Sequence, residues 1–290
     1  MILLDGKKTS QDIKVEIAQA VSKIKLEGGK TPHLAAVLVG SNGASMTYVG
    51  AKVKACEFVG FNSTLIDLPE ETLEEELLNQ IDALNTNDDI DGFIVQLPLP
   101  KHIDEQKILM AVHPDKDVDG FHPMNVGKMA LDVPTFLPAT PFGIMELLER
   151  YKVETSGKNV VVIGRSHIVG RPISILMSQK RKAGDATVTI AHSRTKNLTK
   201  ITREADIIVA ALGIPEFLTG DMVKGGVTII DVGITRVDDA TKKRGFRLAG
   251  DVHFESVSAK SAYITPVPGG VGPMTIAMLL KNTLLACSRR

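Results

Sequence analysis

The stretch Val160-Val161-Val162-Ile163-Gly164-Arg165-Ser166 decides the fold, because it predicts a buried β-strand that ends in a glycine turn. The next residues, His167-Ile168-Val169-Gly170-Arg171-Pro172, lead into a predicted helix over 169–180. In this context, backbone N–H groups and a helix dipole can bind a pyrophosphate. The spacing is not G-x-G-x-x-G, and a tight turn of purely structural purpose could use the same two glycines. The loop alone leaves both interpretations open.

Further strands follow this turn, and they alternate with helical segments. They are predicted at 187–190, 207–209 and 227–232. Such alternation is typical of a Rossmann-like parallel sheet. We expect the loops after the later strands, at Gly213 and at Gly233-Ile234, to lie at the same edge as Gly164, where they would admit a ribose closely. Glycines at strand ends are common in α/β folds, so each of these loops is weak evidence alone.

The residues after strand 187–190 favour one dinucleotide over the other. An NAD enzyme usually carries Asp or Glu there for the ribose hydroxyl, whereas this chain has His192-Ser193-Arg194-Thr195. Arg194 and Ser193, with Arg165, could bind a 2′-phosphate, so NADP is favoured over NAD. The alternative for Arg194 is a solvated loop charge. The predicted cofactor-binding residues are Gly164, Arg165, Ser166, Val169, Gly170, Ser193, Arg194, Thr195, Gly213, Gly233 and Ile234.

The part of the chain before residue 140 also predicts an α/β arrangement. Its predicted elements are helices at 11–26, 44–59 and 72–84 and strands at 34–40, 62–68 and 92–95. A long stretch rich in proline, glycine and histidine then runs through Asn125 and predicts an ordered functional loop.

A helix over 140–150, with Thr140 as its cap and Pro141 at its first position, is predicted to link two domains. A last amphipathic helix over 274–286 is too short to be a domain, and we expect it to fold back onto the first one. The predicted fold class is α/β with two domains and a cleft between them. The predicted domains are 1–139 with 270–290, which binds substrate, and 140–269, which is Rossmann-like and binds NADP.

Composition limits the possible partners. The chain has 290 residues, with 34 basic and 34 acidic side chains, so no broad field favours nucleic acid or an anionic membrane. No apolar run approaches the roughly 20 residues of a membrane span. Cys56 and Cys287 are the two cysteines and lack metal-ligand spacing. The first ten residues do not resemble a signal peptide, so we expect a soluble cytoplasmic protein.

Tyr48 and Lys52 are four residues apart on a predicted helix, so they share a face and could reach one ligand. A surface Tyr and Lys at this spacing are common. Short-chain dehydrogenases use a Tyr-x-x-x-Lys pair within the nucleotide domain, whereas here the pair lies upstream of it. Gln96 follows a buried strand and precedes Pro98 and Pro100, and we expect its amide to reach Lys52. A lysine acts as a base near neutral pH only when its surroundings lower its pKa.

Asp117 and Asp119 alternate in the segment 114–121, so both carboxylates could face one side of an extended chain. A metal site is a poor interpretation, because acidic groups without clustered histidines or further carboxylates make an incomplete cage. A carboxylate that accepts hydrogen bonds from a heterocycle fits better. We therefore predict no metal site.

Several motifs together resemble the bifunctional methylenetetrahydrofolate dehydrogenase/methenyltetrahydrofolate cyclohydrolase family. The resemblance covers nearly the whole chain. It rests on Ser45-Met46-Thr47-Tyr48-Val49-Gly50-Ala51-Lys52, Gln96-Leu97-Pro98-Leu99-Pro100, Lys116-Asp117-Val118-Asp119-Gly120, Gly164-Arg165-Ser166 with Val169-Gly170-Arg171-Pro172, and Thr265-Pro266-Val267-Pro268-Gly269-Gly270-Val271-Gly272-Pro273-Met274-Thr275.

The resemblance implies NADP-dependent oxidation of methylenetetrahydrofolate, followed at the same site by hydrolysis of the methenyl cation to formyltetrahydrofolate. It implies that Lys52 is catalytic, that Gln96 orients it, that Tyr48 stacks on the aminobenzoyl ring and that Asp119 bonds the pterin. A loop around Gly269 would close over the folate. The implied catalytic residues are Lys52, Gln96, Tyr48 and Asp119, and the implied substrate-binding residues add Leu97, Pro98, Pro268, Gly269 and Gly270. The family also suggests a homodimer.

One position departs from the family pattern, because Ala139 stands where the family usually has Cys. We expect altered packing near the cofactor without loss of activity. Three rival interpretations stay open: an NADP enzyme like shikimate dehydrogenase, which lacks the proline-glycine motif, an enzyme that performs one of the two reactions, and a redox sensor that binds NADP without turnover. A sensor has no need of Lys52, Gln96 and Asp119.

Overall fold

In a computed structural model, which describes residues 1–40, 43–242 and 245–289, the chain forms two compact units. One unit, called here the nucleotide-fold unit, contains residues 1–10 and 140–275. The other, called the lysine unit because it contains Lys52, contains residues 11–139 and 276–290. This division differs from the predicted domains at both ends, since residues 1–10 and 270–275 group with the nucleotide fold.

A parallel sheet forms the centre of the nucleotide-fold unit. Within the described residues its strand order is β1-β11-β8-β7-β5-β6. The strands are β1 (Ile2–Leu3), β11 (Ser261–Ile264), β8 (Val227–Asp231), β7 (Ile207–Ala210), β5 (Asn159–Ile163) and β6 (Thr187–Ala191). The sheet explains why the first ten residues belong to this unit, because β1 pairs with β11 and the N–H of Leu4 donates to the carbonyl of Ile264.

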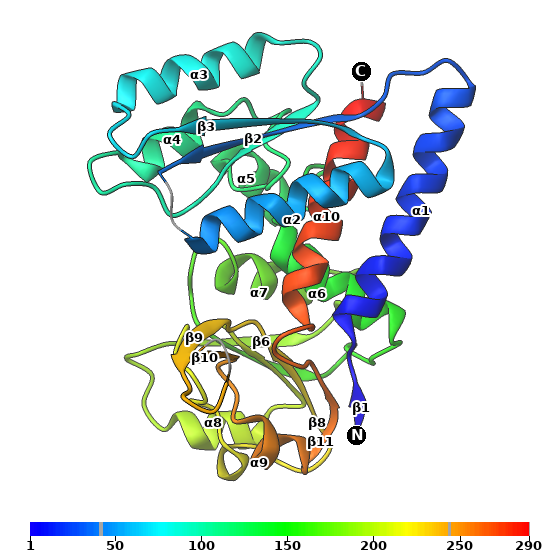
Figure 1. Ribbon diagram of the computed structural model, residues 1–290. Coiled ribbons are helices and arrows are strands. Elements are labelled where there is room, and N and C mark those ends of the chain that lie inside the picture. Colours follow the sequence, from blue (N-terminus) through cyan, green and yellow to red (C-terminus); the bar gives the residue numbers. More distant parts are fainter. Residues whose placement is uncertain (41–42, 243–244, 290) are drawn as a thin grey trace. The chain divides into compact units, whose positions relative to one another are not determined.

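Helices cover both faces of this sheet (Figure 1). The helices are α6 (Ala139–Arg150) and α7 (Gly170–Ser178) on one face, and α8 (Leu198–Glu204) and α9 (Phe254–Ser258) on the other, near the 3₁₀ turn η1 (Gly220–Met222). Alternate strand residues supply the core beneath α8 and α9, including Val161, Ile208 and Ile229, which are at most 3% exposed. A sheet buried on both faces needs continuous apolar strands, as β5 and β7 have.

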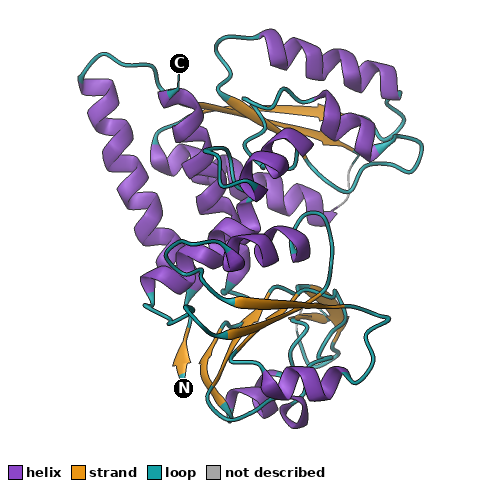
Figure 2. Cartoon of the chain, turned by 180° about the vertical axis from the view of Figure 1, so that it is seen from behind, coloured by secondary structure: helices purple, strands orange, loops and turns teal. Residues whose placement is uncertain are grey.

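The lysine unit is built on a smaller parallel sheet with the strand order β3-β2-β4. Its strands are β2 (His33–Val39), β3 (Asn62–Leu68) and β4 (Gly92–Val95). Helix α3 (Glu74–Thr86) and helix α2 (Gly43–Val59) lie on opposite faces of this sheet (Figure 1). The unit also contains most of α1 (Gly6–Leu26), and Figure 2 shows its helices from behind.

Two short helices lie within the predicted loop and at its predicted end, Asn125. They are α4 (Glu105–Ala111) and α5 (Pro123–Ala130). Each begins at a side-chain cap: the carboxylate of Asp104 accepts from the N–H groups of Gln106 and Lys107, and His122 Nδ1 accepts from Met124. The prediction was wrong because helices of this length show too few turns for a periodic pattern, although both caps are visible in the sequence.

An antiparallel hairpin, β9 (Thr235–Asp238) with β10 (Phe246–Ala249), projects from the nucleotide-fold unit between β8 and α9. The Arg236 guanidinium lies 3.9 Å from the centroid of the Phe246 ring. The sequence of this segment does not indicate the hairpin, because its two strands are only partly buried and carry no continuous apolar run.

The linker helix starts earlier than predicted. Thr140 lies inside α6 and is not its cap, and its Oγ1 is 2.9 Å from Oγ1 of Thr275. Helix α10 (Val271–Ser288) also exceeds its predicted bounds. As predicted, residues 276–290 return to the unit of residues 11–139, where Asn282 Nδ2 donates to the carbonyls of Val118 and Leu137.

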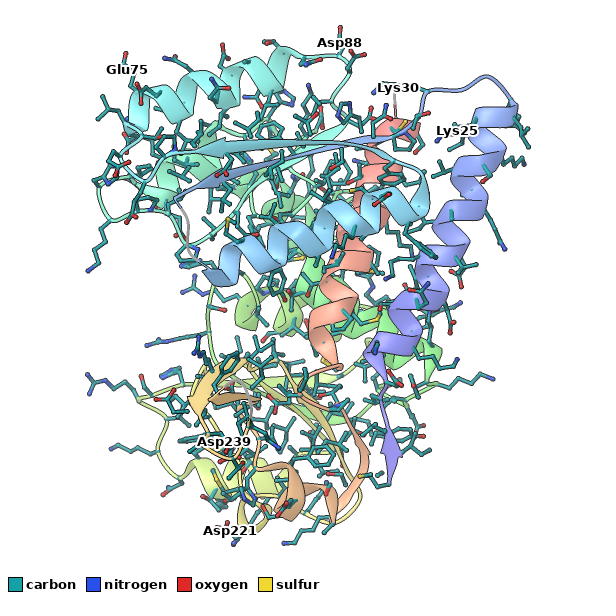
Figure 3. All side chains as sticks on the ribbon, viewed as in Figure 1. Lys25, Lys30, Glu75, Asp88, Asp221 and Asp239 are labelled. Atoms are coloured by element: carbon teal, nitrogen blue, oxygen red, sulfur yellow. The ribbon has the colours of Figure 1, made fainter. Side chains whose placement is uncertain are left out.

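Helix α10 is long and apolar enough to cross a membrane by length and composition, but half of it is buried within the protein. Core helices pass the same test, and Met278 and Leu280 of α10 are fully buried. The surfaces of both units carry charges of both signs: Lys25, Lys30, Glu75 and Asp88 lie on the lysine unit, and Asp221 and Asp239 (Figure 3), together with the exposed Lys182, lie on the nucleotide-fold unit. This mixture agrees with the balanced composition.

Candidate functional site

Lys52 and Gln96 meet in the lysine unit. Lys52 lies on α2 and is 7% exposed, and Gln96 directly follows β4. The Nζ of Lys52 donates to Oε1 of Gln96 over 3.0 Å. The Gln96 amide is fixed on its other side, because Nε2 donates to the carbonyl of Leu97 over 2.7 Å. The sequence prediction that Gln96 reaches Lys52 is confirmed.

Tyr48 shares the helix face of Lys52, as four-residue spacing requires. The Lys52 Nζ lies 5.9 Å from the centroid of the Tyr48 ring. Burial raises the pKa of the Tyr48 phenol, so Tyr48 stays neutral across the physiological range. This part of α2 thus presents an amine beside a neutral aromatic ring.

Burial lowers the pKa of the Lys52 amine, because the low-dielectric interior disfavours the ammonium form. The negative charge of Asp119 opposes this effect in part. Conversely, burial raises the pKa of Asp119, and Lys52 opposes that shift. Burial also raises the pKa of the Cys56 thiol to about 11, so Cys56 remains a neutral core residue.

The two candidate aspartates have different surroundings. The Asp117 carboxylate accepts from the N–H groups of Phe121 and His122 and from Nδ2 of Asn125. These contacts hold the chain that follows and occupy the side chain. Asp119 is half-buried and is coupled electrostatically to Lys52. Asp119 is therefore the carboxylate available to a ligand, and Asp117 supports the loop.

The remaining predicted substrate residues divide between the units. Leu97 and Pro98 follow Gln96 in the lysine unit, and the peptide bond between them is cis. Pro268, Gly269 and Gly270 belong to the nucleotide-fold unit, where the N–H of Lys7 donates to the carbonyl of Gly269. The role of this loop toward the folate and the cleft between domains stay predictions.

The predicted dinucleotide loops leave one edge of the large sheet. The register pairs Ile163 with both Ala191 and Ala210, and Ala210 with Asp231. The four strands β6, β5, β7 and β8 therefore end side by side. The direction of strand order reverses between β5 and β7, and ligands of open α/β sheets bind at such a switch point.

Gly164 lies at this switch point with a φ of +128°, and a Cβ there would overlap the carbonyl of Ala211. Ser166 Oγ accepts from the N–H groups of Val169 and Gly170, each over 3.2 Å. These contacts occupy the amide of Gly170, the first residue of α7, and that of Val169 just before it, so these two amides are not free for a pyrophosphate. Arg165, in the same loop, is exposed.

The residues after β6 form a turn that is held by hydrogen bonds among its own residues. Thr195 Oγ1 accepts from the N–H of His192, and His192 Nδ1 accepts from the N–H of Arg194. The side chains of Ser193 and Arg194 are exposed, and Ile234, after β8, is 50% exposed. The turn thus presents a cation and a hydroxyl where a carboxylate would select NAD.

Sequence reasoning missed Asp231 and Asp251, two buried carboxylates behind the predicted cofactor loops. The N–H groups of Leu212 and Gly213 donate to Oδ2 of Asp251 over 2.6 and 3.0 Å. Asp231 ends β8 and accepts from the N–H of Gly233 over 3.0 Å. The signal in the sequence is Asp231, an aspartate at the end of a strand and two residues before Gly233.

Across the described ranges, no group of three or more His, Cys, Asp and Glu side chains is arranged to hold a metal ion. The fold and the site together define an α/β protein with a dinucleotide-type sheet in one unit and a buried lysine-amide pair in the other.

Comparisons with known proteins give the family. Residues 4–119 match the tetrahydrofolate dehydrogenase/cyclohydrolase catalytic domain, and residues 138–290 match the NAD(P)-binding domain of the same family. The bifunctional protein FolD of Flavobacterium johnsoniae is 70% identical over 290 residues, which cover 100% of this chain and 98% of that protein. The chain belongs to the tetrahydrofolate dehydrogenase/cyclohydrolase family.

Solved structures of the same family have the same fold as this chain. The bifunctional FolD enzyme of Campylobacter jejuni has a TM-score of 0.94 and 49% identity, with 100% of this chain and 99% of that one covered. The Trypanosoma brucei dehydrogenase-cyclohydrolase, solved with NADP cofactor and an inhibitor, has a TM-score of 0.94 and 39% identity, with coverages of 100% and 98%.

The rival interpretation receives support for the fold alone. A shikimate dehydrogenase from Aquifex aeolicus has a TM-score of 0.52 at 12% identity. The two enzymes therefore share a general plan, and the family membership separates them.

Proposed function

We propose that this chain oxidises 5,10-methylenetetrahydrofolate with NADP and then hydrolyses the methenyl product to 10-formyltetrahydrofolate. The observation that carries the proposal is the buried Lys52 amine, held 3.0 Å from the Gln96 amide oxygen. Such a pair suits proton transfer during hydrolysis. Family membership supplies the substrate class.

Lys52 acts in the hydrolytic step. Burial lowers its pKa, so a larger share of the amine is neutral than in water. One N–H of the amine donates to Gln96, which leaves the lone pair free to take a proton from the attacking water. The hydrogen bond from Gln96 Nε2 to the Leu97 carbonyl keeps the amide oxygen turned toward Lys52.

Tyr48 and Asp119 orient the folate. The neutral Tyr48 ring lies beside the amine and offers a face on which an aminobenzoyl ring stacks. Asp119 accepts hydrogen bonds from the N–H donors of the pterin, whereas Asp117 is held by its own loop. Leu97 and Pro98, next to Gln96, line the same part of the lysine unit.

The nucleotide-fold unit fits NADP. The positive φ of Gly164 brings the β5 turn close to Ala211, and among the described residues no heavy atom other than those of its chain neighbours lies within 4 Å of a Cβ built on Gly213. Arg165, Ser193 and Arg194 are exposed and suit a 2′-phosphate. When bound, NADP accepts the hydride from the one-carbon bridge.

The test is an absorbance assay of the purified protein with methylenetetrahydrofolate and either NADP or NAD, followed by the decay of added methenyltetrahydrofolate without dinucleotide. We expect methylenetetrahydrofolate to reduce NADP, and to reduce NAD more slowly. We also expect methenyltetrahydrofolate to decay faster with the protein than without it. Reduction without accelerated decay would leave a dehydrogenase alone. Failure of both assays would overturn the proposal, and NADP binding without either reaction would favour the sensor.

We also propose that the protein is a cytoplasmic homodimer, as family resemblance suggests. Gel filtration with light scattering is expected to give twice the 31.2 kDa chain mass. A monomer at micromolar concentration would overturn the dimer, and recovery of the native protein in the membrane fraction would overturn the cytoplasmic location.

A further inference from the structure

Asp231 and Asp251 bring two carboxylates into the interior of the nucleotide-fold unit. Asp231 is 4% exposed, and Asp251 is fully buried. Asp231 ends β8, and Asp251 follows β10, so the β9–β10 hairpin separates the two in sequence. Buried carboxylates are costly unless their hydrogen bonds compensate for the lost water.

Hydrogen bonds to the two carboxylates connect three segments: the end of β8, residues 251–252 and the turn at 212–213. Asp231 Oδ1 accepts from the N–H of Asp251 over 2.8 Å, and its Oδ2 accepts from Val252 over 3.0 Å. Its own N–H donates to Thr265 Oγ1. The backbone of Asp251 is thereby fixed, and its carbonyl accepts from the N–H of Leu218. Asp231 thus holds the main chain from which the Asp251 side chain extends.

The Asp251 side chain in turn holds the turn after β7. Its Oδ2 accepts from both Leu212 and Gly213, over 2.6 and 3.0 Å. This turn lies beside Gly164 at the switch point, since Gly164 contacts Ala211. The Gly213 position has a φ of +71° and open space above it. One carboxylate oxygen therefore sets the position of the two amides nearest to that space.

Two glycines beside the carboxylates have a structural role, because a side chain at either position would collide with a carboxylate oxygen. A Cβ on Gly233 would overlap Oδ1 of Asp251, and a Cβ on Gly250 would overlap Oδ2 of Asp231. These two glycines are required by the carboxylates. Oδ1 of Asp251 accepts no hydrogen bond from the described residues, so half of this side chain is buried without compensation. The hydrogen bonds that Oδ2 accepts from Leu212 and Gly213 offset part of the free-energy cost of burying this carboxylate.

We propose that Asp251 is a positioning residue for the dinucleotide: its carboxylate holds the Leu212–Gly213 turn in the place where the cofactor binds. This inference rests on the proposed function, because it assumes that the cofactor edge of the sheet is used in the reaction. Asp251 does not touch the reacting atoms. It acts through the two backbone amides.

The test compares three variants with the wild-type protein. Asp251→Ala removes the acceptor, Asp251→Asn keeps one acceptor oxygen, and Asp206→Ala is the matched control. Asp206 also accepts from a backbone N–H, that of Asn159, and pairs with Lys224, but at the opposite edge of the same sheet. The readouts are the NADPH dissociation constant by fluorescence titration, the KM for NADP, and the methenyltetrahydrofolate hydrolysis rate without dinucleotide.

We expect Asp251→Ala to raise the NADPH dissociation constant and the KM for NADP roughly tenfold, the loss that corresponds to about 1.4 kcal/mol. The dinucleotide-free hydrolysis rate should stay at the wild-type level, because Lys52 belongs to the other unit. Asp251→Asn should restore NADPH binding, and Asp206→Ala should lower stability while leaving NADPH binding unchanged.

Wild-type NADPH affinity in folded Asp251→Ala would overturn the proposal, as would an equal loss of affinity in Asp206→Ala. If Asp251→Ala does not fold, Asp251→Ser replaces it, because its smaller side chain leaves room for water at the two amides. A weakened NADPH affinity is then expected, and an unchanged one overturns the inference. The titration needs no turnover, so it remains decisive even if the wild-type protein proves to lack the dehydrogenase activity.

Discussion

The hydrogen-bond partner of Lys52 is the neutral side chain of Gln96, and this neutrality affects the pKa of Lys52. A carboxylate in hydrogen-bond contact would stabilise the ammonium and raise the pKa, whereas the amide of Gln96 carries no charge. Burial therefore dominates, and the pKa of Lys52 falls. Asp119 acts on Lys52 through its field and limits that fall.

Replacement of Lys52 tests its role directly. Lys52→Met should reduce methenyltetrahydrofolate hydrolysis by at least about 100-fold, the range of general acid–base contributions. NADPH affinity should remain near the wild-type value, because the residues of the cofactor edge lie in the other unit. Lys54→Met, an exposed lysine of the same helix, is the matched control and should leave both quantities unchanged. A parallel loss of NADPH binding in Lys52→Met would contradict the separation of roles.

Asp119 offers a prediction with a definite sign. Its negative charge raises the pKa of Lys52, so Asp119→Asn should lower that pKa further. The neutral amine is the active form and its fraction grows as pH rises through the pKa. The acidic limb of the pH profile of kcat for hydrolysis should therefore move to lower pH. A limb that stays in place, or moves to higher pH, would show that Asp119 does not act on Lys52.

At the scale of elements, the start of α7 is held by a side chain of the loop before it. Ser166 Oγ accepts from the N–H of Gly170, the first residue of α7, and from the N–H of Val169, the residue before it. Ser166→Ala should lower the free energy of unfolding by about 1 kcal/mol in urea titrations without ligand. Ser166→Thr keeps a hydroxyl and should lose less. Equal stability of the Ala variant and the wild-type protein would rule out the capping role.

Elements with a clear hydrophobic pattern could be predicted from the sequence, and elements without one could not. Strands β3 and β4 have the predicted bounds, because each is a run of apolar or alternating residues between turn signals. The two-residue strand β1 has no pattern of its own. It exists only because β11, more than 250 residues later, offers it a partner. Such a strand is defined by tertiary pairing, which a local pattern does not contain.

The same limit applies to the site. The Lys52–Gln96 contact could be predicted, because a helix face and a strand end determine where each side chain points. The roles of Asp117 and Asp119 could not be separated by their spacing. Their separation depends on Asn125, which lies on α5 and brings its amide to Asp117. Asp251 was missed because its partners precede it by almost 40 residues.

At the scale of the whole molecule, Asp231 links stability to pH. Burial raises its pKa to about 7, so the folded protein keeps this proton after the unfolded chain has lost it. The contribution of Asp231 to the free energy of unfolding should therefore fall as pH rises from about 4 to about 7, by up to about 4 kcal/mol, and level off above.

Denaturant titrations across this pH range, on the wild-type protein and on Asp231→Asn, measure that contribution as a difference. The Asn variant loses an acceptor and should be less stable at acidic pH, but it should lack the decline between pH 4 and pH 7. Parallel pH dependences for the two proteins would assign the proton to other groups.

The order in which the two units are interleaved along the chain has a consequence for biosynthesis. Residues 11–139 leave the ribosome early, yet their unit lacks the segment from 276 onward, whose Asn282 reaches the carbonyls of Val118 and Leu137. Strand β1 likewise has no pairing partner until β11 has been synthesised. Neither unit can complete its native contacts until translation is nearly finished, so we expect residues 11–139 to keep part of their apolar surface exposed until the last segment has been synthesised.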